Sequence, residues 1–226
     1  MERRKFLRIA VVGGAGLAAC ATPSEDRFEI RTKGGEDDAE VTPCEDLMQE
    51  HGALDRIMLI YDEAARLIAA QKPFEPKVIA KAAAIVRGFV EDYHEQNEEQ
   101  FVFPRLQSHK TETELVTVLF RQHHEGRGLT KEILARANAG QADDTLASLL
   151  GSFTRMYRPH AAREETVLFP AFRKLIGKKA YRDLGEKFEE DEHRRFGEHG
   201  FEATVKQIAE LEQQLGIDEL SSFSPA

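Results

Sequence analysis

Residues 94–104 read HEQNEEQFVFP, and residues 160–170 read HAAREETVLFP. Both segments follow the pattern H-x-x-x-E-E-x-x-x-F-P and begin 66 residues apart. Because side chains four residues apart stack on the same face of an α-helix, each segment aims one imidazole and one carboxylate at the same point. The repeat therefore predicts two helices that each carry half of a polar site. The two halves are His94 with Glu98 and His160 with Glu164.

Apolar residues recur with helical spacing from residue 42 onward and indicate four helices, each with a histidine on its apolar stripe. The predicted helices run from Thr42 to before Lys72-Pro73, from about Pro76 to before Pro104, from about Thr113 to Gly140, and from about Asp144 to near Pro170. The connections are short, which favours an all-α, up-down-up-down four-helix bundle. Pro159 lies inside the last helix and predicts a kink just before His160.

The whole chain of 226 residues is 31% charged and 8% aromatic, a composition that suits long amphipathic helices. Beyond the bundle, Lys179 to Glu198 and Phe201 to Leu215 predict two further helices, the second of which is amphipathic. The expected organisation has five parts: a signal peptide at 1–19, a flexible tether at 20–41, the bundle at 42–176, a C-terminal helical extension at 177–217 and a tail at 218–226.

The charges are divided unevenly along the chain. Of 31 basic and 40 acidic residues, four basic and one acidic lie in residues 1–19, which leaves 27 basic and 39 acidic residues in the rest. A body this acidic repels phosphate backbones, so we expect no nucleic-acid partner.

The first twenty residues predict export. A charged region, an apolar run too short to span a bilayer and a cluster of small residues follow one another, as in a cleavable signal. Arg3-Arg4 resembles a twin-arginine signal. Leu17-Ala18-Ala19-Cys20 resembles a lipobox, which makes Cys20 the lipidated first residue of a protein anchored at the periplasmic face of a membrane. Ala21 favours the outer membrane, and a plain soluble export signal is the alternative.

Two further histidines fall at the level of the repeated half-sites. His51 and His123 lie about eight to ten residues into the first and third predicted helices, and each glutamate of the repeat lies six residues before a proline. At roughly 1.5 Å per residue, all six groups fall about 9 to 15 Å from one end of the bundle. A single such histidine is usually a core residue, but four at one level indicate a metal site. Imidazole and carboxylate without thiolate suit iron, with manganese or zinc as competitors.

At these residues the sequence resembles the hemerythrin-like family, whose HHE cation-binding domain is a four-helix bundle that holds two non-haem irons. The resemblance covers about Thr42 to Ile176. The motifs that carry it are Glu50-His51, His94 to Pro104, Gln122 to Arg127 and Tyr157 to Pro170. It implies that His51, His94, His123 and His160 are terminal ligands and that Glu98 and Glu164 bridge two oxygen-bridged iron ions.

One departure from the family bears on function. Oxygen carriers of the family have a fifth histidine, four residues from its neighbour on the third helix, where this chain has Leu119 and Arg127. The resulting openness favours reaction with peroxide, oxygen or nitric oxide. His193 could supply an additional ligand or lie outside the ligand set. Glu165, like Glu99, is either a partner that orients an imidazole or an exposed charge.

These features predict an exported di-iron protein that binds or senses dioxygen, nitric oxide or peroxide. Two alternatives stay open. One is a di-iron oxidase or peroxidase, so the sequence leaves open whether the chain is an enzyme. The other is an interaction module in which metal staples the bundle and the last helix recruits an unidentified protein partner.

Overall fold

The computed structural model describes residues 41–225. The predicted signal peptide, the lipidation of Cys20 and nearly all of the predicted tether lie outside the described residues. Within residues 41–225 all regular structure is helical and no strand occurs. The prediction of an all-α bundle is confirmed.

The first bundle helix is α1 (Pro43–Ala69), and Thr42 and Glu45 close a capping box at its start. The second is a nearly continuous helical rod in which α-helical and wider π-helical turns alternate. Its segments are α2 (Lys77–Ile85), the π-helical η1 (Val86–His94), α3 (Glu95–Asn97), the π-helical η2 (Glu98–Val102) and α4 (Phe103–Ser108).

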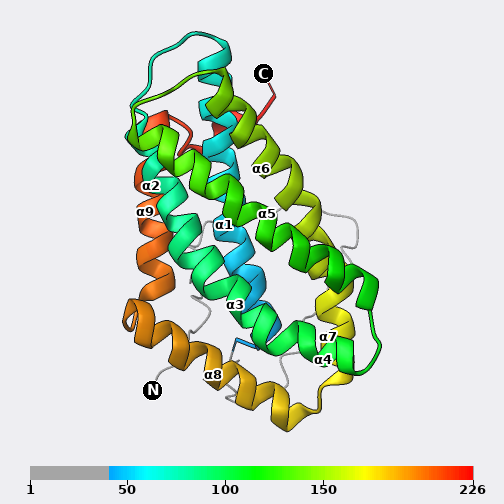
Figure 1. Cartoon of the computed structure of the whole chain (residues 1–226). Helices are drawn as coiled ribbons and strands as arrows, with labels where there is room; N and C mark the ends of the chain where they lie inside the picture. The colour runs from blue at the N-terminus through cyan, green and yellow to red at the C-terminus, as the bar shows by residue number, and fades with distance from the viewer. Residues whose placement is uncertain (1–40, 226) are drawn as a thin grey trace, which may run out of the picture. The chain divides into compact units, whose positions relative to one another are not determined.

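The third bundle helix is α5 (Thr113–Asn138). The fourth consists of α6 (Asp144–Arg163), the π-helical η3 (Glu164–Leu168) and α7 (Phe169–Leu175). In Figure 1 the four rods lie side by side and alternate in direction along the chain.

The predicted ends of the second and fourth helices were wrong. We expected Pro104 and Pro170 to stop them, but helical structure continues to Ser108 and Leu175. Each proline follows a π-helical turn and occupies the first or second position of a new α-helical segment, where a missing backbone N–H costs least. Pro159 lies inside α6, which continues to Arg163.

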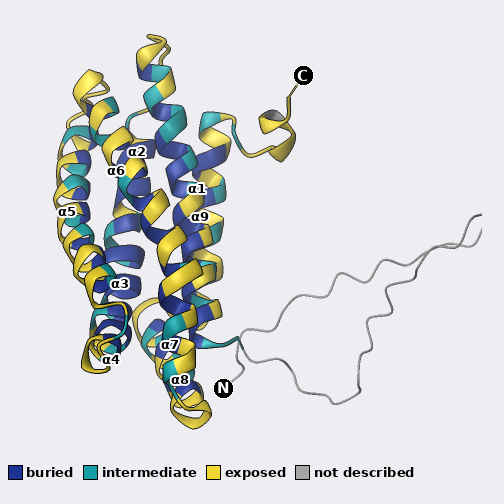
Figure 2. Ribbon diagram, turned by 90° about the vertical axis from the view of Figure 1, so that its right-hand side faces the viewer, coloured by how far each residue is buried: buried dark blue, intermediate teal, exposed yellow. Residues whose placement is uncertain are grey.

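Two apolar clusters fill the bundle on either side of a polar layer. One contains Leu54, Met58, Val86 and Phe153. The other contains Leu47, Phe103, Leu168 and Phe172. Along each helix the histidines and glutamates of the predicted site fall between residues of the two clusters. The buried faces of the helices turn toward one another in Figure 2, so the polar layer is enclosed by protein.

The C-terminal extension covers the bundle with two helices, α8 (Lys178–Phe196) and α9 (Gly200–Leu215), followed by the 3-10 turn η4 (Leu220–Phe223). Phe188 of α8 joins the second apolar cluster, and Ile208 of α9 joins the first. The last helix packs along α1 and α2 (Figure 1). None of the helices in residues 41–225 combines the length and apolar character of a membrane span.

Candidate metal centre

The structure brings together all six predicted ligands, each at most 4% exposed. They come from all four bundle helices, and each glutamate is the first residue of a π-helical turn. The six are His51 in α1, His94 in η1, Glu98 in η2, His123 in α5, His160 in α6 and Glu164 in η3.

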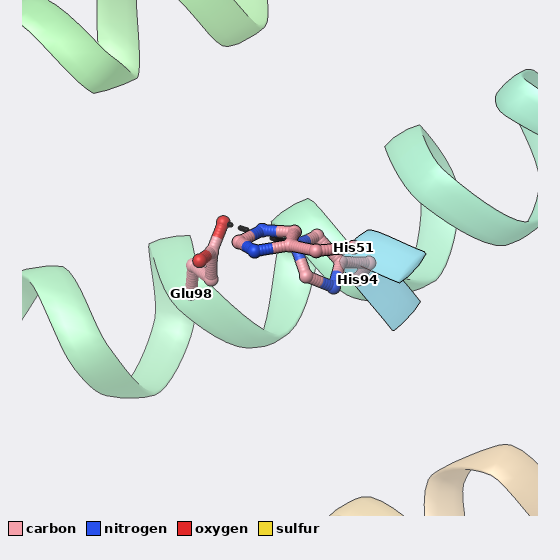
Figure 3. A group of neighbouring side chains, drawn as sticks. All are labelled: His51, His94 and Glu98. Atoms are coloured by element: carbon pink, nitrogen blue, oxygen red, sulfur yellow. Dashed lines mark hydrogen bonds and ion pairs between the residues drawn. The ribbon is translucent and has the colours of Figure 1, made fainter. Parts of the chain in front are cut away.

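One half of the cluster is drawn in Figure 3 and consists of His51, His94 and Glu98, whose ligand atoms lie within 4.8 Å of one another. The Nε2 atoms of His51 and His94 are 3.1 Å apart. The Nε2 atom of His94 lies 3.7 Å from Oε2 of Glu98. We call this half the first metal position.

The other half consists of His123, His160 and Glu164, again within 4.8 Å of one another, and we call it the second metal position. The carboxylates link the two positions. Oε2 of Glu164 lies 3.2 Å from Nε2 of His160 and 3.3 Å from Nε2 of His51. Oε2 of Glu98 lies 3.5 Å from Nε2 of His123. Each glutamate therefore contacts an imidazole of both positions, as a bridging ligand must.

Each of the four histidines is oriented by a hydrogen bond at its outer nitrogen, Nδ1. The distances are 3.1 Å from His51 to Glu165, 2.7 Å from His94 to Glu50, 2.9 Å from His123 to Glu99 and 3.0 Å from His160 to Gln122. Carboxylate and amide oxygens accept, so Nδ1–H donates in each pair. When a ring is neutral, the lone pair of its Nε2 then points inward, which is the tautomer that binds a metal ion.

The outer partners occupy regular positions next to the candidate ligands. Glu50 and Gln122 each precede a histidine of α1 or α5 and contact the histidine on the next bundle helix. Glu99 and Glu165 each follow a bridging glutamate and contact a histidine on α5 or α1. The four hydrogen bonds therefore form two equivalent sets, one at each metal position.

The inward-facing atoms fit a pair of cations. Both side-chain oxygens of Glu98, both of Glu164 and Nε2 of His123 are buried without a hydrogen bond of normal geometry. Each such group costs about 1 to 3 kcal/mol when its hydrogen-bonding capacity is unmet. Metal ions between the imidazoles and carboxylates would satisfy all five atoms, and the set of nitrogen and oxygen donors suits iron.

The metal-free cluster also holds protons unevenly. Burial lowers the pKa of His51, but its contacts with Glu164 and Glu165 outweigh burial and raise that pKa to about 9. Burial lowers the pKa of His123 to about 4 despite its bond to Glu99. Burial and the nearby charge of Glu164 raise the pKa of Glu98. Protons therefore occupy part of the cluster, and metal binding must displace them.

Three further predicted features can be placed. Glu99 and Glu165 both lie against ligand imidazoles, as in one of the two alternatives considered for them. His193 is in none of the histidine and carboxylate groups that residues 41–225 form. It is half-buried in α8, where its neighbour Glu192 takes the position facing Glu50, and consecutive helical residues point about 100° apart.

The outer partners Glu50 and Gln122 had no predicted role. The signal was present in the sequence, since Glu50 directly precedes His51 and Gln122 directly precedes His123. Which imidazole each one reaches depends on how neighbouring helices are rotated, and apolar periodicity does not fix that rotation.

A second polar group flanks one side of the centre and was also not predicted. The Tyr157 hydroxyl donates to Glu95 at 2.7 Å, and Arg127 pairs with both Glu95 and Glu99 at 2.7 Å. A Cβ atom at Gly126 would lie 2.0 Å from the Tyr157 hydroxyl oxygen. Glycine is therefore required there for Tyr157 to pass close to α5.

Fold and site together define a helical bundle with a buried cluster of histidines and carboxylates that could hold metal ions. The model of the Hemerythrin HHE cation binding domain matches residues 42–172, and the chain belongs to this family. Cation binding, typically of iron, is the property that the domain implies.

Similar proteins extend beyond the bundle. Uncharacterized proteins of Mycobacterium tuberculosis, strains H37Rv and CDC 1551, and of Mycobacterium bovis are each 43% identical over 232 residues. These alignments cover 99% of this chain and 91% of each relative. No solved structure matches the chain significantly.

Proposed function

We propose that the chain is an exported, lipid-anchored, non-haem di-iron protein that binds or senses dioxygen, nitric oxide or peroxide. The observation that supports the metal centre most strongly is the set of five buried, inward-facing donor atoms without hydrogen bonds. The four oriented imidazoles support it further, because each already presents Nε2 to the interior.

In the proposed centre His51 and His94 would hold one ion and His123 and His160 the other, and Glu98 and Glu164 would be shared. Bound iron would supply coordination positions for a small ligand. The protein itself would hold the ligands in fixed positions and exclude water from the centre. Phe169 stacks on His51 with ring centroids 5.7 Å apart, and Phe103 stacks on His123 at 5.4 Å. Both rings belong to the second apolar cluster and cover one side of the centre. Only small molecules could pass them to reach the metal ions.

Elemental analysis of the purified protein tests the centre. We expect about two iron ions per chain after anaerobic loading. The double variant His94→Ala/His160→Ala removes one imidazole from each position and should bind less than half of this iron. The matched control His109→Ala/His199→Ala alters two exposed histidines outside the cluster and should bind the full amount. Equal iron in all three proteins would refute the assignment.

Absorption spectra of the reduced, iron-loaded protein test the proposed ligands. We expect a reversible change on adding nitric oxide or oxygen, and loss of that change in His94→Ala/His160→Ala. Sustained turnover of peroxide would instead favour the oxidase or peroxidase alternative. If none of the three ligands alters the spectrum of the loaded protein, the binding function is wrong.

Fractionation of expressing cells tests the anchor. The twin-arginine-like and lipobox-like motifs support export and lipidation at Cys20, so Cys20→Ala should move the protein from the membrane fraction to the soluble fraction. Cys44→Ala is the control, because Cys44 is buried in the second apolar cluster. A wild-type protein found wholly in the soluble fraction would contradict the anchor.

A further inference from the structure

The outer hydrogen bonds differ between the two metal positions. At the first position both imidazoles donate to carboxylates, His94 to Glu50 and His51 to Glu165. At the second position His160 donates to the neutral amide oxygen of Gln122. Glu50 and Gln122 hold equivalent places, each directly before a histidine and hydrogen-bonded to the histidine of the next bundle helix, so this difference is a single exchange of an acid for its amide.

The second position is weakened again at its other imidazole. His123 donates to Oε1 of Glu99 at 2.9 Å, and Arg127 donates to the same oxygen at 2.7 Å. Arg127 also pairs with Glu95. The positive charge of the guanidinium offsets the negative charge that Glu99 would otherwise present to the imidazole.

These differences act on the metal through the imidazole. A bound cation draws electron density from the ring and makes its Nδ1–H more acidic, so an anionic acceptor stabilises the complex more than a neutral one. Hydrogen bonds to charged groups contribute roughly twice as much as those between neutral groups. Two carboxylates support the first position. An amide and a charge-compensated carboxylate support the second.

The second position also lies next to solvent. A cleft of about 310 Å³ opens between α5 and α6, and its wall includes Leu119, Gln122, Pro159 and His160. The amide of Gln122 and the ring of His160, which are hydrogen-bonded to each other, therefore form part of the cleft. At the first position Glu50, the acceptor that corresponds to Gln122, is only 2% exposed, whereas Glu165, the acceptor of His51, is 33% exposed.

We infer that the two metal positions are unequal, and that the ion held by His123 and His160 binds last, is released first and exchanges through the cleft between α5 and α6. Gln122 is the positioning residue that sets this difference, and Glu50 is its counterpart at the first position. The inference rests on the proposed function only in requiring that the chain bind two metal ions at this centre.

Anaerobic titration of the full chain with cobalt(II) alone, followed by visible absorption, tests the inference. The wild type should bind two ions in two steps whose affinities differ at least tenfold, the lower limit of typical effects of such outer partners. Gln122→Glu should strengthen the second step about tenfold. Glu50→Gln should weaken the first step by a similar factor. Gln107→Glu adds the same charge at an exposed site and should change neither step.

Single-position variants assign the steps to residues. His160→Ala should retain the tighter ion, and His94→Ala should retain the weaker one. Adding Gln122→Glu to His94→Ala should restore about tenfold in affinity, whereas adding it to His160→Ala should have no effect. With excess chelator, the wild type should lose one ion faster than the other, and Gln122→Glu should slow the faster phase.

The outcomes separate this inference from the function on which it rests. Binding of no metal would refute both. Two ions bound with equal affinity in the wild type, or affinities that Gln122→Glu and Glu50→Gln leave unchanged, would refute the inequality and leave the di-metal centre standing. Retention of the weaker ion in His160→Ala would reverse the assignment and refute it as stated.

Discussion

The two halves of the metal centre share their ligands and differ in their surroundings. Residues 66 positions apart in the second and fourth helices supply the same pair, a histidine and a glutamate four residues later. Three residues before each histidine and one residue after it, the halves diverge. Glu91 on the second helix corresponds to Tyr157 on the fourth, and Glu95 corresponds to Ala161. The candidate ligands therefore correspond between the two halves, whereas the residues around them differ.

Removing the metal ions that the two halves are proposed to share should have the largest effect on stability. A ligand present at a thousand times its dissociation constant stabilises the folded state by about 4 kcal/mol, which for a chain of this size is a rise of about 10 °C in Tm. We expect chelation of iron to lower Tm by about that amount, measured by calorimetry. His94→Ala/His160→Ala should show little response to chelator. An equal response in the variant would place the stabilising ions elsewhere.

Two glycine substitutions in α5 test the packing of Tyr157 beside the second metal position. Gly126→Ala forces a Cβ atom to within 2.0 Å of the Tyr157 hydroxyl oxygen, so we expect a loss of about 2 kcal/mol in the free energy of unfolding. Gly128 has no atom within 4 Å of the corresponding Cβ position. Gly128→Ala should therefore stabilise the protein by about 0.5 to 1 kcal/mol, because alanine is the better helix former. Urea denaturation of both variants gives the comparison, and equal effects would contradict the close packing of Tyr157.

The smallest expected effect concerns Glu91 in the metal-free protein. Burial raises the pKa of this carboxyl, although Thr130 and Arg87 partly oppose the shift. A raised pKa means that the folded state keeps a proton that the unfolded chain releases, so this contribution to stability is present below about pH 4.5 and is lost as the pH rises through the folded-state pKa.

Glu91→Gln removes this titration. At pH 7 the variant should be more stable than the wild type by about 1 kcal/mol, the scale of free energy that a modest rise in pKa represents, because the contacts with Arg87 and Thr130 offset the cost of the buried charge only in part. The difference should shrink toward pH 4.5. Urea denaturation at several pH values measures it, and a difference that grows as the pH falls would contradict the sign.

Much of the fold follows from local patterns. Local features include the helical period of apolar residues, the capping box at Thr42 and the positive φ of 72° at Gly140. Most helices begin and end close to the residues that these features indicate. The ends near Pro104 and Pro170 were wrong because a π-helical turn before each proline lets the rod continue. Such a turn leaves no mark in apolar periodicity.

The site divides in the same way. His94 with Glu98 and His160 with Glu164 could be found from spacing within one helix. The partners Glu50 and Gln122 could not be assigned to an imidazole, because each contact crosses between helices. Tyr157 reaches Glu95 only because α5 carries glycine at position 126. The contact of Tyr157 with Glu95 depends on how α5 and α6 pack together, which a single sequence does not specify.

The wide turns that begin at Glu98 and Glu164 have a consequence for how this protein can change in length. In a regular α-helix, deleting one residue swings every later side chain by about 100° and would carry the downstream apolar residues out of the core. A π-helical turn already contains a surplus residue. Loss of the exposed Gln100 could close that turn into an α-helical one while Phe103 and Leu106 keep facing inward. Single-residue gaps between related proteins should therefore gather at these two turns.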